Sequence, residues 1–311
     1  MQPVRTAVIG VGYLGRFHAQ KYALLPESQL VAVADVVEES REQVAVECGC
    51  RAIADYRDVL DEVEAVSIAT PTPLHHEIAK HCLERGVHVL VEKPITQTPG
   101  QARELIEIAA RHDRILQVGH LERFNAAIVA LGDTLGKPRF IESHRLAPFK
   151  ERGTDVNVVL DLMIHDIDRI QSLVGTPIES IDAVGAPVFS PEIDIANARI
   201  HYAGGCVANT TASRVSLKTE RKLRLFQGVA YVSIDLHQKV LTIVRKRPPG
   251  ADTAPGQVVI EERSYEQGDA LKLEIAAFLR SIRAGGPPVV SGEDGLRALE
   301  TAIRITELVQ A

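Results

Sequence analysis

Three spaced glycines that directly follow a short apolar run limit the fold of this chain more than any other sequence feature. The run Thr6–Ile9 leads into Gly10, Gly12 and Gly15 in the pattern GxGxxG, and a helical pattern follows. In a strand–turn–helix setting, the first glycine permits a tight turn, the second lets a pyrophosphate approach the backbone, and the third lets helix and strand pack closely. Because N–H groups point outward at the start of the helix, the turn predicts a dinucleotide-binding site.

Strand and helix patterns alternate through the first 118 residues. The strand-like runs are short and almost continuously apolar, which is typical of strands buried on both faces of a parallel sheet. They are Thr6–Ile9, Leu30–Ala34, Ala65–Ala69, Val87–Val91 and Ile115–Val118, and the helical patterns between them are Leu14–Leu25, Glu38–Glu47, Leu74–Arg85 and Pro99–His112. The alternation predicts a doubly wound α/β domain of the Rossmann type, which binds the dinucleotide, over residues 1–120.

From about residue 121 the pattern changes to consecutive strands joined by short loops. Helices are predicted at Arg123–Leu135, Asn157–Val174, Leu271–Arg283 and Glu293–Val309. Strands are predicted at Arg139–Leu146, Ile178–Val184, Ile195–Tyr202, Cys206–Ser213, Lys222–Phe226, Tyr231–Leu236 and Val240–Arg245, followed by an exposed loop at 248–257. This series indicates an α+β domain with a large, open, mainly antiparallel sheet over residues 121–311. A sheet that helices cover on one side leaves a face that needs a partner, so we expect a homodimer or homotetramer.

A carboxylate ends the second predicted strand, where the adenosine ribose of a dinucleotide would lie. Asp35 follows Gly15 by 20 residues, and a carboxylate in this position accepts hydrogen bonds from the ribose hydroxyls. A carboxylate also repels a 2′-phosphate, and the next residues, Val36 and Val37, add no cation. The sequence therefore predicts NAD rather than NADP as the cofactor.

Two further segments follow predicted strands at the edge of the sheet where ligands of such domains bind. Thr70 and Pro71 lead to His75, which either contacts the cofactor or begins a helix as a partly exposed residue. Glu92 and Lys93 follow the next strand. A lysine in that place either points its charge at a crevice or partner, or lies solvated in a loop. The expected cofactor contacts are Gly10, Gly12, Tyr13, Leu14, Gly15, Asp35, Thr70, Pro71, His75, Glu92 and Lys93.

The predicted helix 157–174 carries a histidine among carboxylates. Asp161 and His165 are four residues apart and His165 and Asp168 are three apart, so they share a helix face. Apolar neighbours on the helix indicate that this polar stripe is half-buried. A histidine beside a carboxylate suits general acid–base chemistry. The alternatives are a core histidine satisfied by a carboxylate and a metal site; glutamate and cysteine ligands are not clustered here, and we expect no metal.

The balance of charges argues against nucleic acids and anionic membranes as partners. The chain of 311 residues has 35 Lys and Arg against 41 Asp and Glu, a net charge of −6, whereas such partners need a basic surface. Individual basic residues are candidates for an anionic substrate or for the solvated surface. They are His120, Arg123, Arg145, Arg152, Arg214, Lys218, Arg221 and Lys222.

The cysteines and the N-terminus indicate a cytoplasmic protein. Cys48 and Cys50 have one residue between them, which is not the CxxC spacing of a redox or zinc site. The N-terminus lacks the basic start and long apolar stretch of a signal peptide. No apolar run approaches the roughly 18 residues of a membrane span, so we expect no membrane partner.

Taken together, these segments resemble the Gfo/Idh/MocA oxidoreductases. The matching pieces are Gly10–Gly15, Asp35, Ala69–His75, Glu92–Pro94, Val118–Asn125 and Asp161–Asp168, which occur in the family's order along essentially the whole chain. The resemblance implies an NAD-dependent sugar dehydrogenase (EC 1.1.1.-) whose open sheet often mediates dimerisation. It also implies that Lys93, Asp161 and His165 face the nicotinamide and the reacting hydroxyl. His165 would take the hydroxyl proton, Lys93 would stabilise negative charge on the oxygen, and Asp161 would position the substrate or tune the histidine.

Within the family, the chain is most similar to bacterial enzymes that oxidise the 3-hydroxyl of UDP-N-acetylglucosamine so that an aminotransferase can install an amine, for example for lipid A precursors. Val118–Asn125 and Arg152–Asp168 carry this similarity, whereas Ala126 stands where the family commonly has proline. The similarity implies a nucleotide-sugar substrate and functional coupling to a sugar aminotransferase. The expected substrate contacts are His120, Arg123, Arg145, Arg152, Asp161 and His165.

Other activities on the same scaffold are the alternatives. They are a dehydrogenase of a free sugar or cyclitol, a biliverdin-type reductase, and an NAD-binding regulator without catalysis. The presence of Lys93, Asp161 and His165 argues against a regulator, and the Asp–His pair favours an alcohol over a bilin.

Overall fold

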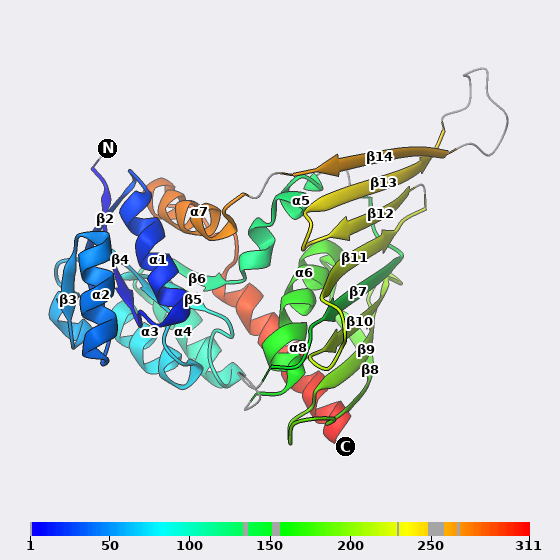
Figure 1. Cartoon of the computed structure of the whole chain (residues 1–311), viewed down its shortest axis with the longest axis horizontal. Coiled ribbons are helices and arrows are strands. Elements are labelled where there is room, and N and C mark those ends of the chain that lie inside the picture. Colours follow the sequence, from blue (N-terminus) through cyan, green and yellow to red (C-terminus); the bar gives the residue numbers. More distant parts are fainter. Residues whose placement is uncertain (1, 133–135, 151–155, 229, 248–257, 266–267) are drawn as a thin grey trace. The chain divides into compact units, whose positions relative to one another are not determined.

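The computed structural model describes residues 2–132, 136–150, 156–228, 230–247, 258–265 and 268–311, which form two compact units (Figure 1). Unit 1 contains Met1–Phe124 and Asp269–Leu299, and unit 2 contains Asn125–Gly268 and Glu300–Ala311. The expected boundary at residue 120 stays a prediction. The return of Asp269–Leu299 to unit 1 has no counterpart in the sequence patterns.

The sheet of unit 1 is parallel throughout, in the order β3-β2-β1-β4-β5-β6. Its strands are β1 (Val4–Ile9), β2 (Ser28–Ala34), β3 (Arg51–Ile53), β4 (Ala65–Ile68), β5 (His88–Glu92) and β6 (Leu116–Gly119). The chain reverses its direction of winding between β1 and β4, which opens a ligand crevice at the carboxyl ends of these strands. The predicted Rossmann-type fold is confirmed.

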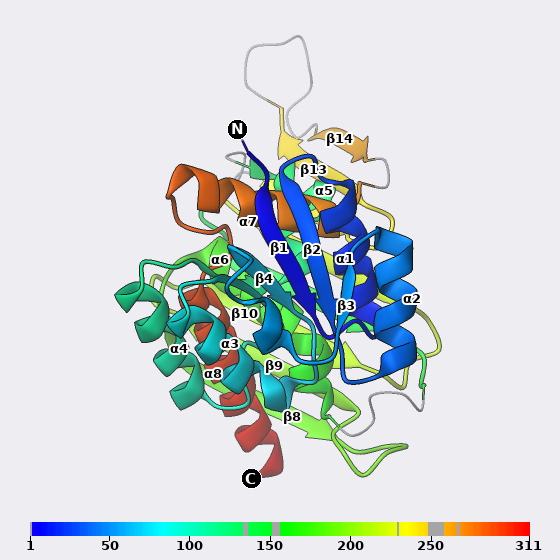
Figure 2. The same ribbon diagram turned by 90° about the vertical axis from the view of Figure 1, so that its left-hand side faces the viewer.

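Helices cover the sheet of unit 1 and supply much of its core. They are α1 (Tyr13–Leu24), α2 (Glu38–Cys48), α3 (His75–Glu84), α4 (Pro99–Arg111) and α7 (Ala270–Ala284). Helix α1 packs against α2 and α7, whereas α3 packs against α4 (Figure 2). Tyr22 of α1, Val8 of β1 and Phe278 of α7 belong to one cluster of buried apolar residues. A helix from the last part of the chain therefore completes the core of the N-terminal unit.

The sheet of unit 2 is mostly antiparallel, in the order β14-β13-β12-β11-β7-β10-β9-β8. Its strands are β7 (Phe140–Leu146), β8 (Ile178–Ala186), β9 (Ile195–Tyr202), β10 (Val207–Ser213), β11 (Glu220–Phe226), β12 (Ala230–Asp235), β13 (Val240–Lys246) and β14 (Val258–Ser264). Strand β10 pairs with β7 in parallel, and the other described pairs are antiparallel. The predicted large, mainly antiparallel sheet is confirmed.

One face of this sheet carries the helices of unit 2. Helix α6 (Ile164–Val174) packs against β7 and β10, and α5 (Ala126–Val129) packs against β12. Helix α8 (Gly292–Gln310) runs from the last part of unit 1 into unit 2. In the described part of unit 2, Figure 1 shows no helix on the opposite face of the sheet. None of the described helices is long and apolar enough to cross a membrane.

The helix predicted over 123–135 is wrong, because the chain breaks at Asn125. A 3₁₀ turn covers Leu121–Phe124, and α5 spans only Ala126–Val129. Asn125 has extended backbone (ψ 129°) and caps α5, and its side chain accepts a hydrogen bond from Ala127 N at 3.1 Å. Its amide nitrogen also donates to Leu236 O at 3.1 Å, which anchors the break. Residues 133–135 and the predicted loop 248–257 lie outside the described residues.

The helix predicted over 157–174 also starts irregularly. A π-helical turn covers Val159–Met163 before α6 begins. Asn157 supports this turn, since its Oδ1 accepts hydrogen bonds from the backbone of Val159 at 3.0 Å and of Leu160 at 3.1 Å. Such π turns are rare and occur often at functional sites. This one holds Asp161.

Candidate active site

The glycine turn of unit 1 has the geometry that a dinucleotide needs. Gly10 adopts a positive φ of 82°, and a Cβ there would lie 2.8 Å from Thr70. A Cβ on Gly15 would lie 1.8 Å from the Gly10 carbonyl oxygen. In contrast, a Cβ on Gly12 would meet nothing within 4 Å. The first and third glycines are therefore fixed by packing, and the second faces open space that a ligand can approach.

The start of α1 and the neighbouring loop fit an anionic group. Gly12 is the N-cap of α1, makes no side-chain capping bond, and no acidic residue lies in the first turn. An anion can therefore use the N–H groups and the positive end of the helix dipole. Thr70 Oγ1 is buried beside this turn and has no hydrogen-bond partner in the described part of the chain. Tyr13 (69% exposed) and Leu14 (37%) add apolar surface for a ligand.

Asp35 is held at the point where the sheet reverses its winding. Its Oδ2 accepts a hydrogen bond from Val11 N at 2.7 Å, and its Oδ1 accepts one from Val37 N at 2.9 Å. The carboxylate is thus joined to the glycine turn. A cation that sequence reasoning missed lies close by, because Arg41 of α2 donates to the carbonyl oxygens of Asp35 and Val36 at 3.4 Å. The prediction that no cation lies beside Asp35 is therefore correct only for the residues that directly follow it, Val36 and Val37.

We expect NAD(H) to bind more tightly than NADP(H), because the Asp35 carboxylate repels a 2′-phosphate. Removing a like charge at about 4 Å is worth roughly 1 kcal/mol even in water. The double substitution Asp35→Ser, Val36→Arg should therefore shift the ratio of the two Kd values at least several-fold toward NADP, measured by fluorescence titration. Val36→Arg alone is the control, since it leaves the carboxylate. Equal affinity for both cofactors in the native protein would contradict the expectation.

His75 joins the two loops that follow β4 and β5. Its ring is buried, with Nε2 2.8 Å from Thr70 O and Nδ1 2.9 Å from Pro94 O. Burial lowers the pKa of His75, although both carbonyl groups oppose this shift. These contacts favour a role in holding the loops in place over direct contact with a cofactor. Pro71, in contrast, is exposed in the loop after β4.

Lys93 lies half-buried at the carboxyl end of β5. The preceding Glu92 points into unit 1, where its Oε1 lies 2.9 Å from His18 Nε2 and its Oε2 accepts a hydrogen bond from the Lys93 backbone at 3.3 Å. Sequence reasoning missed His18. The sequence feature that could have pointed to His18 is its position three residues after Gly15, on the first helix of a dinucleotide domain.

In unit 2, Asp161 and His165 are both half-buried, as the pattern of their neighbours predicts, whereas Asp168 of the same stripe is buried. The next carboxylate, Asp166, is buried and accepts a hydrogen bond from Arg145 Nε at 2.7 Å and another from Arg169. Burial favours a higher pKa for Asp166, but the guanidinium groups of Arg145 and Arg169 outweigh it and lower the pKa. Arg145 is thus an internal partner of α6, which favours a positioning role over direct contact with a phosphate.

The remaining expected substrate contacts are divided between the units. His120 is buried in unit 1, where Arg123 also lies, with Arg123 Nη2 3.4 Å from Asp294 Oδ1. Arg152 lies outside the described residues. Lys93 belongs to unit 1 and both Asp161 and His165 to unit 2. Among the described residues, no group of three or more His, Cys, Asp or Glu could hold a metal ion.

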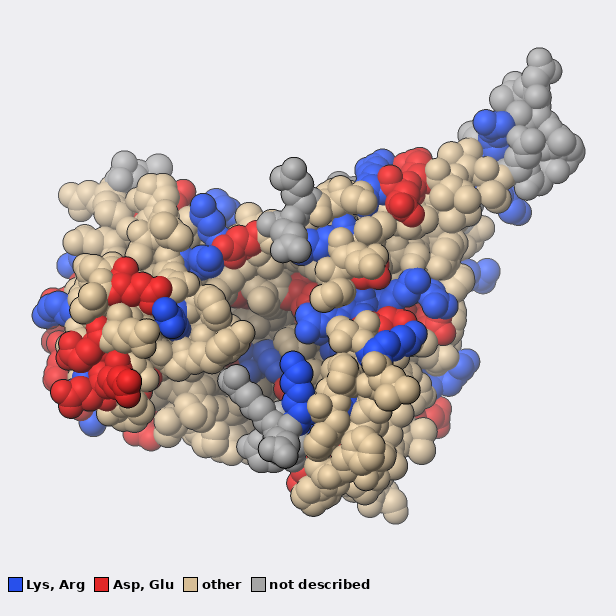
Figure 3. Space-filling model, in the orientation of Figure 1, with Lys and Arg blue, Asp and Glu red and all other residues tan. Residues whose placement is uncertain are grey.

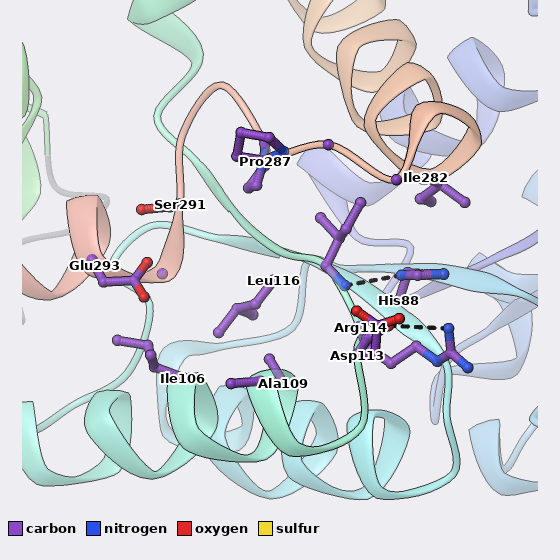
Figure 4. A pocket seen from close by; sticks show the side chains of 16 residues that line it. His88, Ile106, Ala109, Asp113, Arg114, Leu116, Ile282, Pro287, Ser291 and Glu293 are labelled. Atoms are coloured by element: carbon purple, nitrogen blue, oxygen red, sulfur yellow. Dashed lines mark hydrogen bonds between the residues drawn. The ribbon is translucent and has the colours of Figure 1, made fainter.

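A cavity of about 400 Å³ lies at the other end of the parallel sheet (Figure 4). His88 and Leu116, which begin β5 and β6, line it together with Glu293. Burial and the charge of Arg114 lower the pKa of His88 to about 4, and His88 Nδ1 accepts a hydrogen bond from Ile115 N at 2.9 Å. This neutral histidine is engaged within the fold, and the cavity contains none of the predicted site residues.

Comparison with known proteins identifies both parts of the chain. Residues 4–120 match the model described as "Oxidoreductase family, NAD-binding Rossmann fold", and residues 128–227 match the "GFO/IDH/MocA C-terminal domain". The chain is 40% identical over 311 residues to the UDP-N-acetylglucosamine 3-dehydrogenase of Acidithiobacillus ferrooxidans, covering 99% of this chain and 98% of that protein.

Two further comparisons agree with this result. A solved structure of the Acidithiobacillus ferrooxidans dehydrogenase superposes with a TM-score of 0.93, at 41% identity and covering 100% of this chain and 98% of that one. The myo-inositol 2-dehydrogenase of Thermotoga maritima is more distant, at 27% identity over 95% of this chain and 93% of that protein.

Proposed function

Because the chain belongs to the Gfo/Idh/MocA family of NAD-dependent oxidoreductases, we propose that it oxidises the 3-hydroxyl of UDP-N-acetylglucosamine to a ketone. The observation that carries this substrate is the full-length likeness to a dehydrogenase named for it. The nucleotide geometry of unit 1 supports the cofactor, and the half-buried Asp161 and His165 of unit 2 supply groups for proton transfer.

In this proposal the residues of unit 1 hold the cofactor. The N–H groups at the start of α1 bind the pyrophosphate, and Asp35 accepts hydrogen bonds from the ribose hydroxyls. When bound, NAD⁺ supplies the acceptor for the hydride that leaves the carbinol carbon. The apolar side chains of Tyr13 and Leu14 shield the bound dinucleotide from water.

The proposed chemical step assigns one role to each of His165, Lys93 and Asp161. His165 accepts the proton of the sugar hydroxyl as the C–H bond breaks with its electron pair and the C–O bond gains double-bond character. Lys93 stabilises the negative charge that develops on the oxygen. Asp161 orients the substrate or the imidazole. His120, Arg123 and Arg152 are the proposed contacts of the sugar and its diphosphate, since the guanidinium fork binds two phosphate oxygens at once.

The basic surface of unit 2 supports an anionic substrate. Although the net charge is −6, Figure 3 shows Lys and Arg side chains gathering over the strands of unit 2. On strand β11, Arg221 lies on the face of the buried Leu223 and Leu225, which carries the helices. Such a local field attracts a diphosphate from solution.

The substrate is tested by NADH formation with UDP-N-acetylglucosamine, free N-acetylglucosamine and myo-inositol. Charge-assisted hydrogen bonds contribute about 1.5–3 kcal/mol each, so losing two contacts to the diphosphate should lower kcat/KM for the free sugar by about 100-fold or more. Comparable kcat/KM for a free sugar or for the cyclitol would overturn the nucleotide-sugar assignment and favour the alternative dehydrogenases.

We also propose coupling to a sugar aminotransferase, as in the formation of lipid A precursors, and a cytoplasmic location. The 3-ketone is the chemical substrate of transamination, so an added aminotransferase with an amino donor should increase NADH formation by removing the product. The four cysteines are free thiols, which suits a reduced compartment.

The exposed sheet face supports the proposed homodimer or homotetramer. Phe140, Phe226, Tyr231, Val244 and Ile260 are paired in register across β7, β11, β12, β13 and β14. Neighbouring rings have centroids 5.5 Å and 5.1 Å apart. Light scattering at micromolar concentration should give at least a dimer, and Tyr231→Glu should shift it toward the monomer. A native monomer would contradict this assembly.

A further inference from the structure

Helix α7 carries a carboxyl group into the core of unit 1. Glu274 is 0% exposed and lies on the same side of the helix as Leu271 and Phe278, which belong to the apolar cluster. Neither of its carboxyl oxygens has a hydrogen-bond partner in the described part of the chain. An ionised carboxylate in such a place costs far more free energy than the neutral acid. The geometry therefore favours a Glu274 that keeps its proton.

A second carboxyl group and an imidazole share this buried region. Glu92 is 8% exposed, and its Oε1 lies 2.9 Å from Nε2 of the buried His18 of α1. Gly119 of β6 leaves room for this carboxyl group because it has no Cβ. A Cβ at that position would lie only 2.9 Å from Glu92 Oε1. His18 Nδ1 is buried, and it also has no hydrogen-bond partner among the described residues. Burial raises the pKa of Glu274 well above its ordinary value, and the charge of Glu92 raises it further.

The other polar groups that face this region are neutral or engaged elsewhere. From α1, the Tyr22 hydroxyl is 2.8 Å from Ser67 Oγ. From β6, Gln117 donates to the backbone oxygen of Glu274 at 3.4 Å. From α3, His75 interacts with Glu92 and has its pKa lowered by burial. Helix α7 also packs against the 3₁₀ turn Leu121–Phe124, which carries Glu122 and Arg123 and follows the buried His120. Among these groups, Glu92 is the one whose charge acts on Glu274.

We propose that Glu274 is a positioning residue for Lys93. Its neutral carboxyl group packs behind Glu92, so that Glu92 is the one negatively charged group of the two. Glu92 then keeps its contacts with His18 Nε2 and with the backbone N–H of Lys93. If Glu274 were ionised, two carboxylates would repel each other beneath the turn and displace it. The proposal rests on the role of Lys93 in the proposed function, but the proton on Glu274 is tested independently.

The first test compares the thermal stability of the wild type and Glu274→Gln in the absence of ligands. The folded chain holds a proton on Glu274 that the unfolded chain loses above the ordinary pKa of a glutamate. The contribution of this group to stability is therefore complete below that pKa and is lost as pH rises toward the higher folded value. The Gln variant has no such proton, so its Tm should rise relative to the wild type between pH 5 and pH 8.

The control for this test is Glu107→Gln, since Glu107 is an exposed glutamate on α4 of the same unit. Its difference from the wild type should stay constant over the same pH range. A Tm difference between wild type and Glu274→Gln that does not change with pH would overturn the neutral acid.

The second test asks whether the proton serves the reaction. Glu274→Gln should keep kcat within about twofold of wild type near pH 7, whereas Glu274→Ala should lower kcat at least tenfold with little change in the Kd of NAD. An equal loss in both variants would overturn the positioning role. If the wild type oxidises none of the sugars, the proposed function fails, while the pH dependence of Tm still supports or overturns the neutral Glu274.

Discussion

Replacing His165 with alanine should lower kcat for sugar oxidation by roughly 10²–10⁴-fold, the usual contribution of a general base. The residue is half-buried at the start of α6, where an imidazole can reach a substrate and still release its proton to water. The Kd of NAD should change little, because the proposed adenosine and pyrophosphate contacts are Asp35 and the glycine turn. Steady-state kinetics and a cofactor titration on the same preparation measure both quantities.

The pH dependence provides a second readout for His165. An imidazole must be neutral to accept a proton, so wild-type oxidation should fall as the pH becomes acidic, and His165→Ala should lose this dependence. His237→Ala is the matched control, because His237 is an exposed histidine of the same unit. Turnover near the wild-type value in His165→Ala would remove it as the base and leave Lys93 or a water molecule in that role.

Lys93→Met should lower kcat by a comparable or larger factor. Methionine keeps most of the length of the side chain but removes the charge that stabilises the oxygen in the transition state, and single groups of this kind contribute about 10²–10³-fold. Glu92 should still hold the backbone of residue 93, since that contact uses the peptide N–H. NAD affinity should therefore stay close to that of the wild type.

Lys80→Met is the control for this substitution. Lys80 lies on α3 of the same unit and pairs with Glu104 at 2.6 Å, so its loss changes charge without touching the proposed site. The variant Lys93→Arg should recover only part of the activity, since a guanidinium group has a different shape and reach. Full activity in Lys93→Met would assign the charge stabilisation to another residue.

The regular part of the fold could be predicted from the sequence, and its exceptions have local causes. Continuous apolar runs predicted five of the six strands of unit 1, but β3 has only three residues and its pattern is too short to detect. Strand β14 was missed because its apolar part, Val258–Ile260, has only three residues and charged residues follow at once. The π turn at Val159–Met163 depends on the cap by Asn157, which periodicity does not reveal.

The candidate site could be predicted where local geometry decides it. Gly10 is required by its positive φ of 82°, and Gly15 by its close approach to the Gly10 carbonyl oxygen within the same turn. His18 meets Glu92, 74 residues away, and Glu274 enters the core of unit 1 through tertiary packing, so the residues near them in sequence gave no direct signal. Arg41 is different, because its contacts are with Asp35 and Val36, six and five residues earlier, and the sequence prediction considered only Val36 and Val37. Glu274 did leave an indirect signal: a glutamate between Leu271 and Phe278 stands at the helical spacing of core residues.

The discontinuity of unit 1 also governs how the protein is made. A ribosome delivers β1–β6 first, then residues 125–268 of unit 2, and only then α7 with Leu271, Ile275 and Phe278. During that interval the nascent chain exposes the apolar sides of α1 and β1, which are binding surfaces for chaperones. A ribosome-tethered chain that ends at residue 268 should therefore remain sensitive to protease in its N-terminal part, and protection should appear only after α7 has left the exit tunnel.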